Sequence, residues 1–235
     1  MILDNWTKKD YQSFLDLLEN NIDLDYQQFH KNLLNSDINF FGVRTPILKN
    51  IASYISKGNY NEFITLNQHN SYEEIIIHGL IIGYVKEDIN IIRNMLDNFI
   101  PYINNWAIND IVAANMKVFK NEQEAGFIII NEYLKSNNNW TIRFGLILLL
   151  DHYINDKYIN KLLDISCDIK SDDYYVKMAI SWLLSICYIK YPDTTESVFK
   201  RQVLDKWTNN KAIQKIRESY RVTAKQKESL IKYKM

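Results

Sequence analysis

The chain has 235 residues, of which 47% are hydrophobic and 24% are charged; such a composition is typical of globular proteins and excludes disordered and fibrous classes. Lys and Arg balance Asp and Glu at 28 each, but residues 1–200 carry an excess of seven negative charges and residues 201–235 an excess of seven positive charges. This asymmetry can direct a cationic surface toward an anionic ligand, although a solvated basic helix would give the same distribution.

Targeting and metal signals are absent from the sequence. No apolar run reaches the roughly 18 residues of a membrane span, and the N-terminus MILDNWTKKD lacks the layout of a signal peptide, so we expect a cytoplasmic protein without a membrane partner. Cys167 and Cys187 have no CxxC or Cys/His companion, which favours buried thiols over a disulfide or a zinc site. The four histidines have no metal-ligand spacing: His30, His69, His78 and His152. We therefore expect no metal and no cofactor.

The predicted elements are helices. Only 6 Gly and 3 Pro occur, which leaves little turn chemistry for a many-stranded sheet. Apolar residues recur at i, i+3, i+4 and i+7, and this spacing predicts about 12–14 helices and no strand. The clearest segments in chain order are YQSFLDLL (11–18), PILKNIASYI (46–55), EEIIIHGLIIGYV (73–85), INIIRNMLDNFI (89–100) and AISWLLSICYI (179–189).

Helix starts and breaks support this prediction. Three pairs of residues have the chemistry of a helix start: Thr45 before Pro46, Ser71 with Glu74 three residues later, and Asn139 before Trp140. Short breaks at residues 56–59, at residues 135–139 and around Pro192 separate helices. None is long enough to mark a domain boundary, so we expect one domain over residues 1–235.

A repeat near 40 residues links three prominent side chains. Trp106, Arg143 and Trp182 are 37 and 39 residues apart, each in the early or middle part of a predicted helix. Two helices per period of about 40 residues is the signature of HEAT-type repeats, which stack into an α-solenoid. We predict an all-α, curved solenoid of helical pairs, with one helix of each pair lining a concave face.

The stretch NNWAIND (104–110) places an aromatic ring and a carboxylate on one helical face. Trp106 and Asp110 are four residues apart, so their side chains project side by side. Alone, each residue has a structural explanation: Trp106 as core, Asp110 as a cap or as a partner of Asn109, and Arg143 as a partner of a carboxylate or a helix end. Their combination at one-repeat offsets favours a binding surface.

The side chains of this set suit a nucleotide. An Arg fork fits a phosphate, a Trp face fits a sugar or a base, and a carboxylate can stabilise developing positive charge. Further cations could touch backbone phosphates, giving affinity without sequence choice. They are Lys177, Lys211, Lys215, Arg217 and Arg221.

These segments resemble a known family. NNWAIND, NWTIRFGLILLLDHYI and YYVKMAISWLLSICYIKYP, preceded by FFGVRTPILKNIA and followed by NKAIQKIRESYRV, are similar to the AlkD-type DNA alkylation-repair glycosylases built from HEAT-like repeats. The resemblance extends from about residue 10 to residue 225. The order and spacing of Trp106, Asp110, Arg143 and Trp182 agree with the active-site cleft of that family.

The resemblance implies an enzyme that hydrolyses the N-glycosidic bond of cationic N3- and N7-alkylpurines in double-stranded DNA, without flipping the lesion into a pocket. Asp110 would stabilise the sugar cation and orient water, Trp106 and Trp182 would pack against the deoxyribose, and Arg143 would hold a phosphate. The leaving base is already positively charged, so no strong general acid is needed. We expect the protein to act as a monomer.

Two departures from the family pattern and two other functions stay open. The Tyr that family members carry on an N-terminal helix has no clear match, with Tyr26 and Phe29 as candidates, and Lys177 stands where an uncharged polar residue is usual. The alternatives are a non-catalytic protein that binds branched or distorted DNA by shape, and a protein-interaction scaffold, the commonest use of HEAT solenoids.

Overall fold

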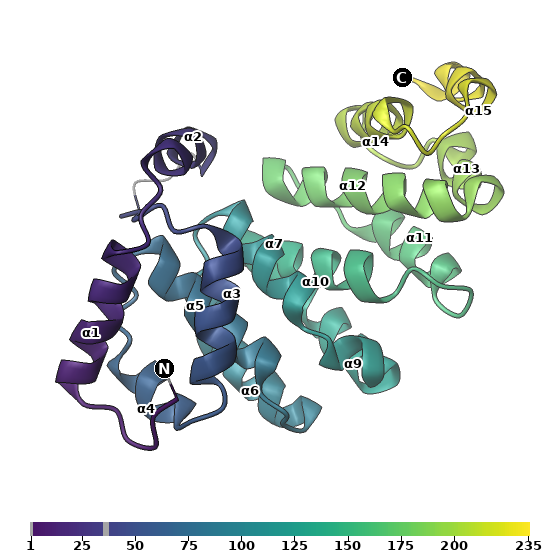
Figure 1. Cartoon of the computed structure of the whole chain (residues 1–235). Helices are drawn as coiled ribbons and strands as arrows, with labels where there is room; N and C mark the ends of the chain where they lie inside the picture. Colours follow the sequence, from purple (N-terminus) through teal and green to yellow (C-terminus); the bar gives the residue numbers. More distant parts are fainter. Residues whose placement is uncertain (1, 35–37) are drawn as a thin grey trace. The chain divides into compact units, whose positions relative to one another are not determined.

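The computed structural model describes residues 2–34 and 38–235 (Figure 1). These residues form fifteen α-helices and two short 3₁₀ helices, and no strand is present among them. The all-α prediction is confirmed. The number of helices exceeds the predicted range because segments such as α8 (Val118–Asn121) and α15 (Ala224–Ser229) are too short to show helical periodicity in the sequence.

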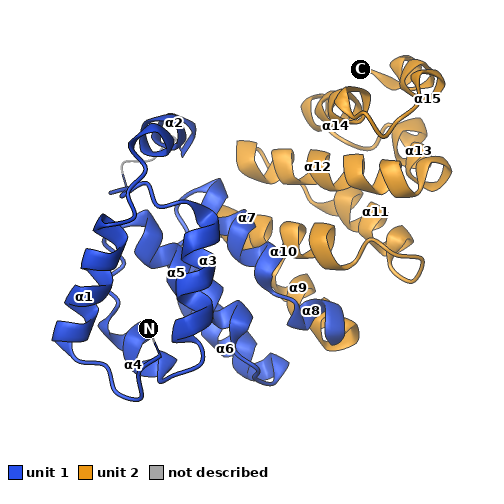
Figure 2. Cartoon of the chain, in the orientation of Figure 1, with its two compact units in different colours: residues 1–122 blue, residues 123–235 orange. Residues whose placement is uncertain are grey.

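The chain divides into two compact units, residues 1–122 and residues 123–235 (Figure 2). The predicted single domain over residues 1–235 depends on how the two units combine, so it stays a prediction. Each unit has its own helical core. None of the helices in the described residues has the length and apolar character that a membrane span requires.

Unit 1 is built around a succession of alternate helices. α3 packs on α5 and α5 packs on α7, while α6 covers α5 and α1 contacts α4. The helices of this unit are α1 (Lys8–Glu19), α2 (Leu24–Leu34), α3 (Thr45–Ile55), α4 (Tyr60–Leu66), α5 (Tyr72–Tyr84), α6 (Ile89–Phe99), η1 (Ile100–Tyr102), α7 (Trp106–Asn115) and α8. The central helix α5 is buried from Tyr72 to Ile82, as expected for a helix that is apolar all round.

Gly79 allows α5 and α7 to approach closely. A Cβ atom at this position would collide with the side chains of Val112 on α7 and Phe99 on α6. The absence of a side chain therefore sets the distance between the helix that forms the core and the helix that carries Trp106 and Asp110.

Buried carboxylates fix the start of α5. Glu73 is fully buried, and its side chain accepts hydrogen bonds from the backbone N–H groups of Phe41, Gly42 and Val43 at 2.8–3.1 Å. Gly42 has φ +93°, a left-handed conformation that favours glycine. The neighbouring Glu74 accepts from the hydroxyls of Tyr11 and Ser71. Burial raises the pKa of Glu73, although the three backbone donors oppose this effect.

Unit 2 repeats the same arrangement. α10 packs on α12 and α12 packs on α14, while α9 contacts α10, and α11 and α13 contact α12. The helices are α9 (Gln123–Tyr133), α10 (Asn139–His152), α11 (Ile159–Asp168), α12 (Tyr174–Lys190), α13 (Pro192–Arg201), α14 (Lys206–Glu218), α15 and η2 (Ile231–Tyr233). Stacking of alternate helices is the packing expected of an α-solenoid, so the predicted all-α solenoid class is confirmed, whereas its curvature and concave face stay predictions.

The helix-start predictions are correct to within one residue. Ser71 caps α5 as predicted, its side chain accepting from the N–H of Glu74. Asn138, not Asn139, is the N-cap of α10, because its Oδ1 accepts from the N–H groups of Trp140 and Thr141. α3 begins at Thr45, one residue before the predicted start at Pro46.

Cys167 and Cys187 are both free and buried, as predicted.

Candidate functional site

Trp106 and Asp110 occupy the first two turns of α7, in unit 1. The helix starts at Trp106 because the side chain of Asn105 accepts hydrogen bonds from the N–H groups of Ala107 and Ile108, both at 3.0 Å. Helical spacing then places the indole and the carboxylate on one face, as predicted. Both side chains are half-buried, so each keeps part of its surface in solvent.

The indole of Trp106 is hydrogen-bonded to the last turn of α2. Its Nε1–H donates to the backbone carbonyl of Leu33 at 3.2 Å. Leu33 lies one turn after Phe29 on α2, and both side chains are exposed, Phe29 at 63%. The ring of Tyr26, in contrast, is half-buried beneath the guanidinium of Arg44, which lies 5.2 Å from the ring centroid. Of the two candidates for an N-terminal aromatic contact, Phe29 is therefore the accessible one.

His30 does not take part in this site. It is buried at 9% exposure, and its ring stacks on Phe40 with centroids 5.3 Å apart. Burial lowers its pKa, so the neutral ring is favoured. The ring of His30 is therefore part of the packing between α2 and the segment before α3. No group of three or more His, Cys, Asp or Glu side chains arranged for a metal ion occurs within residues 2–34 and 38–235.

Arg143 is buried in unit 2, which the sequence did not indicate. Its side chain is on α10, the residue is 3% exposed, and its Nη1 donates to the backbone carbonyl of Tyr175 at 2.6 Å. The guanidinium carbon also lies 6.0 Å from the centroid of the Tyr175 ring, which in turn contacts Trp140 at 4.9 Å. Arg143 thus anchors the N-terminal turn of α12 to α10. The predicted contact between Arg143 and a phosphate would require an accessible guanidinium, and it stays a prediction.

Trp182 lies further along α12. It is half-buried and follows Tyr175 by seven residues, so it shares a face with that residue about 10 Å along the helix. The α10 contact at Tyr175 and Trp182 are therefore about two turns apart on the same helix face. Trp106 and Asp110 belong to unit 1 and Arg143 and Trp182 to unit 2, so the four-residue catalytic set stays a prediction.

Three of the predicted DNA-binding lysines form a continuous cationic cluster in unit 2. The Nζ atoms of Lys177 and Lys211 lie 5.4 and 5.7 Å from the ring centroid of Trp207. Lys215 follows Lys211 by one turn of α14. Burial lowers the pKa of Lys215, and the charges of Lys211 and Arg143 lower it further against the opposing Glu218 carboxylate. Positive groups from α10 and α14 are therefore close enough to repel one another.

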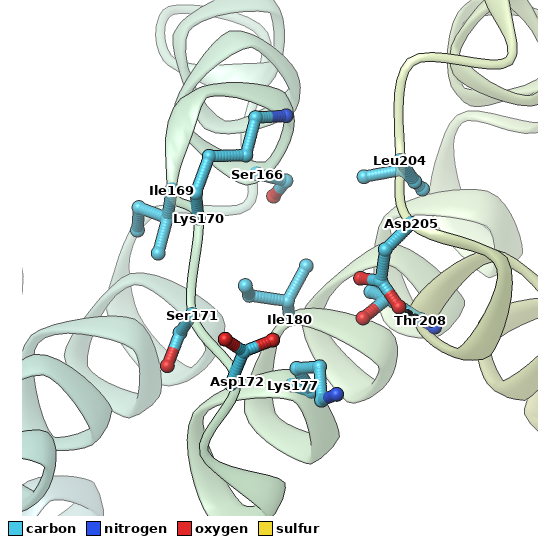
Figure 3. A pocket seen from close by; sticks show the side chains of 10 residues that line it. All are labelled: Ser166, Ile169, Lys170, Ser171, Asp172, Lys177, Ile180, Leu204, Asp205 and Thr208. Atoms are coloured by element: carbon cyan, nitrogen blue, oxygen red, sulfur yellow. Dashed lines mark hydrogen bonds between the residues drawn. The ribbon is translucent and has the colours of Figure 1, made fainter.

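Lys177 also faces acidic neighbours. It lines a pocket of about 250 Å³ together with Asp172 and Asp205 (Figure 3). Burial would raise the pKa of Asp205, but hydrogen bonds from Thr208 and the charge of Lys177 lower it overall. The charge of Lys177 is thus partly balanced by Asp205, whereas Lys211 donates to the neutral amide of Gln214 at 2.9 Å. We expect Lys177 to contribute less to anion binding than Lys211.

Arg217 and Arg221 do not belong to this cluster. Arg217 follows Lys215 by two residues, a rotation of about 200° that directs it to another side of α14. Its Nε is buried without a hydrogen-bond partner within the described residues. Arg221 is exposed in the loop between α14 and α15. The sequence grouped these cations by charge alone, and helix geometry separates them.

Trp207 is the residue that sequence reasoning missed. The edge of Tyr174 also contacts its ring, with centroids 5.6 Å apart. The available signal was the spacing of Trp207, Lys211 and Lys215 at i, i+4 and i+8, which puts all three on one helix face. The contribution of α12 could not be found this way, because Lys177 is 30 residues distant.

Comparison with known proteins identifies the family of the chain. None of the curated proteins searched matches the sequence. A family model does match, covering residues 12–216 and therefore both units, and its description is "DNA alkylation repair enzyme". With most of its length in that match, the chain belongs to the DNA alkylation repair enzyme family.

Proposed function

We propose that this repair enzyme is a DNA glycosylase that hydrolyses the N-glycosidic bond of cationic N3- and N7-alkylpurines in duplex DNA. The observation that carries the proposal is the pairing of Trp106 with Asp110 at the start of α7, where one aromatic ring is held in place beside a carboxylate. The cationic cluster of unit 2 supports DNA as the partner, because its positive charges suit backbone phosphates.

The chemistry needs an anion more than an acid. When the bond from the sugar C1′ to the purine breaks, its electron pair neutralises the alkylated base, which leaves as a neutral molecule. The sugar is left with oxocarbenium character, and a carboxylate beside it lowers the energy of that state. Water adds to C1′ and releases one proton. Asp110 has the charge for the first task and can orient the water for the second.

Base release tests the proposal. Purified protein incubated with duplex DNA containing 7-methylguanine or 3-methyladenine should liberate the free base. Asp110→Asn should reduce the rate roughly 100-fold or more, as expected when a key electrostatic group is lost, while DNA affinity is retained. Asp97→Asn is a matched control, since Asp97 is a partly exposed carboxylate of unit 1 that pairs with Arg93 at 3.6 Å. No release by the wild type at micromolar protein over hours would refute the glycosylase proposal.

The burial of Arg143 favours one alternative. Because this side chain anchors α12 instead of standing free for a phosphate, a protein that binds branched or distorted DNA without catalysis is the second candidate. That function predicts salt-sensitive binding to junctions or bulged duplexes without base release. The same preparation serves both measurements, so the two functions are separated directly.

A further inference from the structure

Trp207 has no role in the proposed chemistry, and it does not belong to the buried face of α14. That face consists of five side chains: Thr208, Asn209, Ala212, Ile213 and Ile216. Trp207 is half-buried in the first turn and shares its side of the helix with Lys211. The indole therefore has a surface that the core does not need.

An open pocket lies beside this ring. Its volume is about 560 Å³, within the range of roughly 300–1,000 Å³ that is typical of sites for small organic groups. Six residues line it: Lys206, Trp207, Asn210, Lys211, Gln214 and Lys234. None of the six is acidic. The pocket thus combines one large aromatic surface with three ammonium groups.

The amides of the pocket are already engaged. Asn210 donates to the carbonyl of Met235 at 2.8 Å and accepts from its N–H at 3.0 Å. Gln214 accepts from Lys211 at 2.9 Å and donates to Glu218 at 2.7 Å. The indole and the lysines are the groups that can meet a ligand, and the ammonium groups of Lys177 and Lys211 already lie 5.4 and 5.7 Å from the ring centroid of Trp207, where they adjoin a stacked base. Nearby opposing charges are Glu218 on the next turn and Asp205 at the N-cap of α14.

We propose that Trp207, with Lys206, Lys211 and Lys234, binds a nucleotide of unpaired, single-stranded DNA. The base would stack on the indole and the adjoining phosphates would lie against the ammonium groups. Stacking on an aromatic side chain accepts any base, and lysines follow the backbone without sequence choice. Bases inside a duplex have both faces covered by neighbours, so only an unpaired base can use the ring.

This inference rests on the proposed function for the choice of DNA as the polymer. A repair enzyme meets unpaired bases where a lesion has weakened the duplex. The Trp207 site is built entirely within unit 2, whereas Asp110 belongs to unit 1. Binding at Trp207 and base release can therefore be measured and lost independently.

The test compares two fluorescent ligands of equal charge by anisotropy. One is a single-stranded dT 12-mer, and the other is a 12-mer of abasic deoxyribose phosphates, which offers the same phosphates but no base. The wild type should bind the dT 12-mer about tenfold more tightly. Trp207→Ala should abolish this preference, and Trp207→Phe, which keeps an aromatic face, should retain part of it.

Matched controls come from unit 1, where Tyr54 is 51% exposed and Lys57 lies 5.0 Å from its ring centroid. Tyr54→Ala and Lys57→Gln remove the same kinds of group outside the proposed site and should leave both affinities unchanged. Lys211→Gln and Lys234→Gln should weaken both ligands equally. Each should also make the dependence of log Kd on log salt shallower by about 0.7, the value for one phosphate contact on a single strand.

The outcomes separate this inference from the glycosylase proposal. Equal wild-type affinity for the two ligands, or a base preference that survives Trp207→Ala, would overturn the nucleotide site. Circular dichroism of each variant checks that unit 2 is folded, and the lysine variants keep the inference testable if Trp207→Ala does not fold. Release of alkylated base from duplex DNA is scored separately, so a protein without glycosylase activity can still show the dT preference.

Discussion

The indole N–H of Trp106 donates to the backbone carbonyl of Leu33 at 3.2 Å. This bond joins the first turn of α7 to the last turn of α2, two segments 73 residues apart in sequence. It fixes the orientation of the ring beside Asp110, so the aromatic surface is in place before a substrate arrives. For the proposed glycosylase, such positioning is an important part of the expected rate.

Replacing Trp106 by Phe tests this positioning. The variant keeps an aromatic ring and loses the N–H donor, so the backbone carbonyl of Leu33 must accept a hydrogen bond from water instead. We expect base release to slow by roughly tenfold and the free energy of unfolding to fall by about 0.5–1.5 kcal/mol, the usual contribution of one hydrogen bond. Single-turnover release of 7-methylguanine and urea unfolding provide the two measurements. A rate equal to that of the wild type would show that the bond to Leu33 is not needed.

The charges around Lys215 give a second prediction, which concerns the direction in which its pKa shifts in three variants. Burial and the neighbouring cations Lys211 and Arg143 lower its pKa, while Glu218 raises it. Lys211→Met should therefore raise the pKa of Lys215, Arg143→Met should raise it as well, and Glu218→Gln should lower it further.

Titration of ¹³C-methylated lysines by NMR can follow Lys215 directly. Lys57→Met serves as the control, since Lys57 is in unit 1 and its removal should not move the Lys215 resonance. If Lys211→Met left the pKa of Lys215 unchanged or lowered it, Lys211 and Lys215 would not have the proximity described above.

Much of the fold follows from local sequence. The i, i+3, i+4 pattern identifies the long helices, and a capping residue such as Ser71 marks a start because its chemistry acts within three residues. Asn138 and Asn139 are chemically alike, so sequence alone cannot decide which of them caps α10. The four-residue helix α8 is stabilised by packing and carries too little periodicity to be predicted.

The site was predictable only where it is local. Trp106 with Asp110, and Lys211 with Lys215, follow from i, i+4 spacing on one helix. The burial of Arg143 depends on the carbonyl of Tyr175, which is 32 residues away. Backbone groups have no sequence signature, so a long side chain that binds one of them cannot be distinguished in advance from one that points to solvent.

A histidine pair in unit 1 gives a prediction about pH. His69 Nε2 lies 2.8 Å from His78 Nδ1, and His69 stacks on Tyr102 with ring centroids 3.7 Å apart. Burial lowers the pKa of both histidines, and the pKa of His78 falls to about 3. In the unfolded chain a histidine binds a proton as the pH falls below about 6.5. In the folded protein His78 stays neutral until the pH approaches about 3.

The sign follows from this difference in proton binding. Above about pH 6.5 the histidines are neutral in both the folded and the unfolded state, and the contribution of the buried His78 to the free energy of unfolding is fully present. This contribution is lost as the pH falls from there toward about 3. At about pH 5 the loss from His78 alone should be about 2 kcal/mol, since one pKa unit corresponds to about 1.4 kcal/mol. Urea unfolding between about pH 7.5 and about pH 5 measures it.

His69→Asn isolates the pair within this pH dependence. Asn tolerates the left-handed backbone at this position, where φ is +55°, and removes one of the two titrating rings. The variant should be less stable than the wild type at neutral pH, because His78 loses its partner, yet its stability should change less between pH 7.5 and pH 5. An equal slope for the two proteins would place the acid sensitivity elsewhere, and a wild-type stability that does not fall on acidification would contradict the lowered pKa of His78.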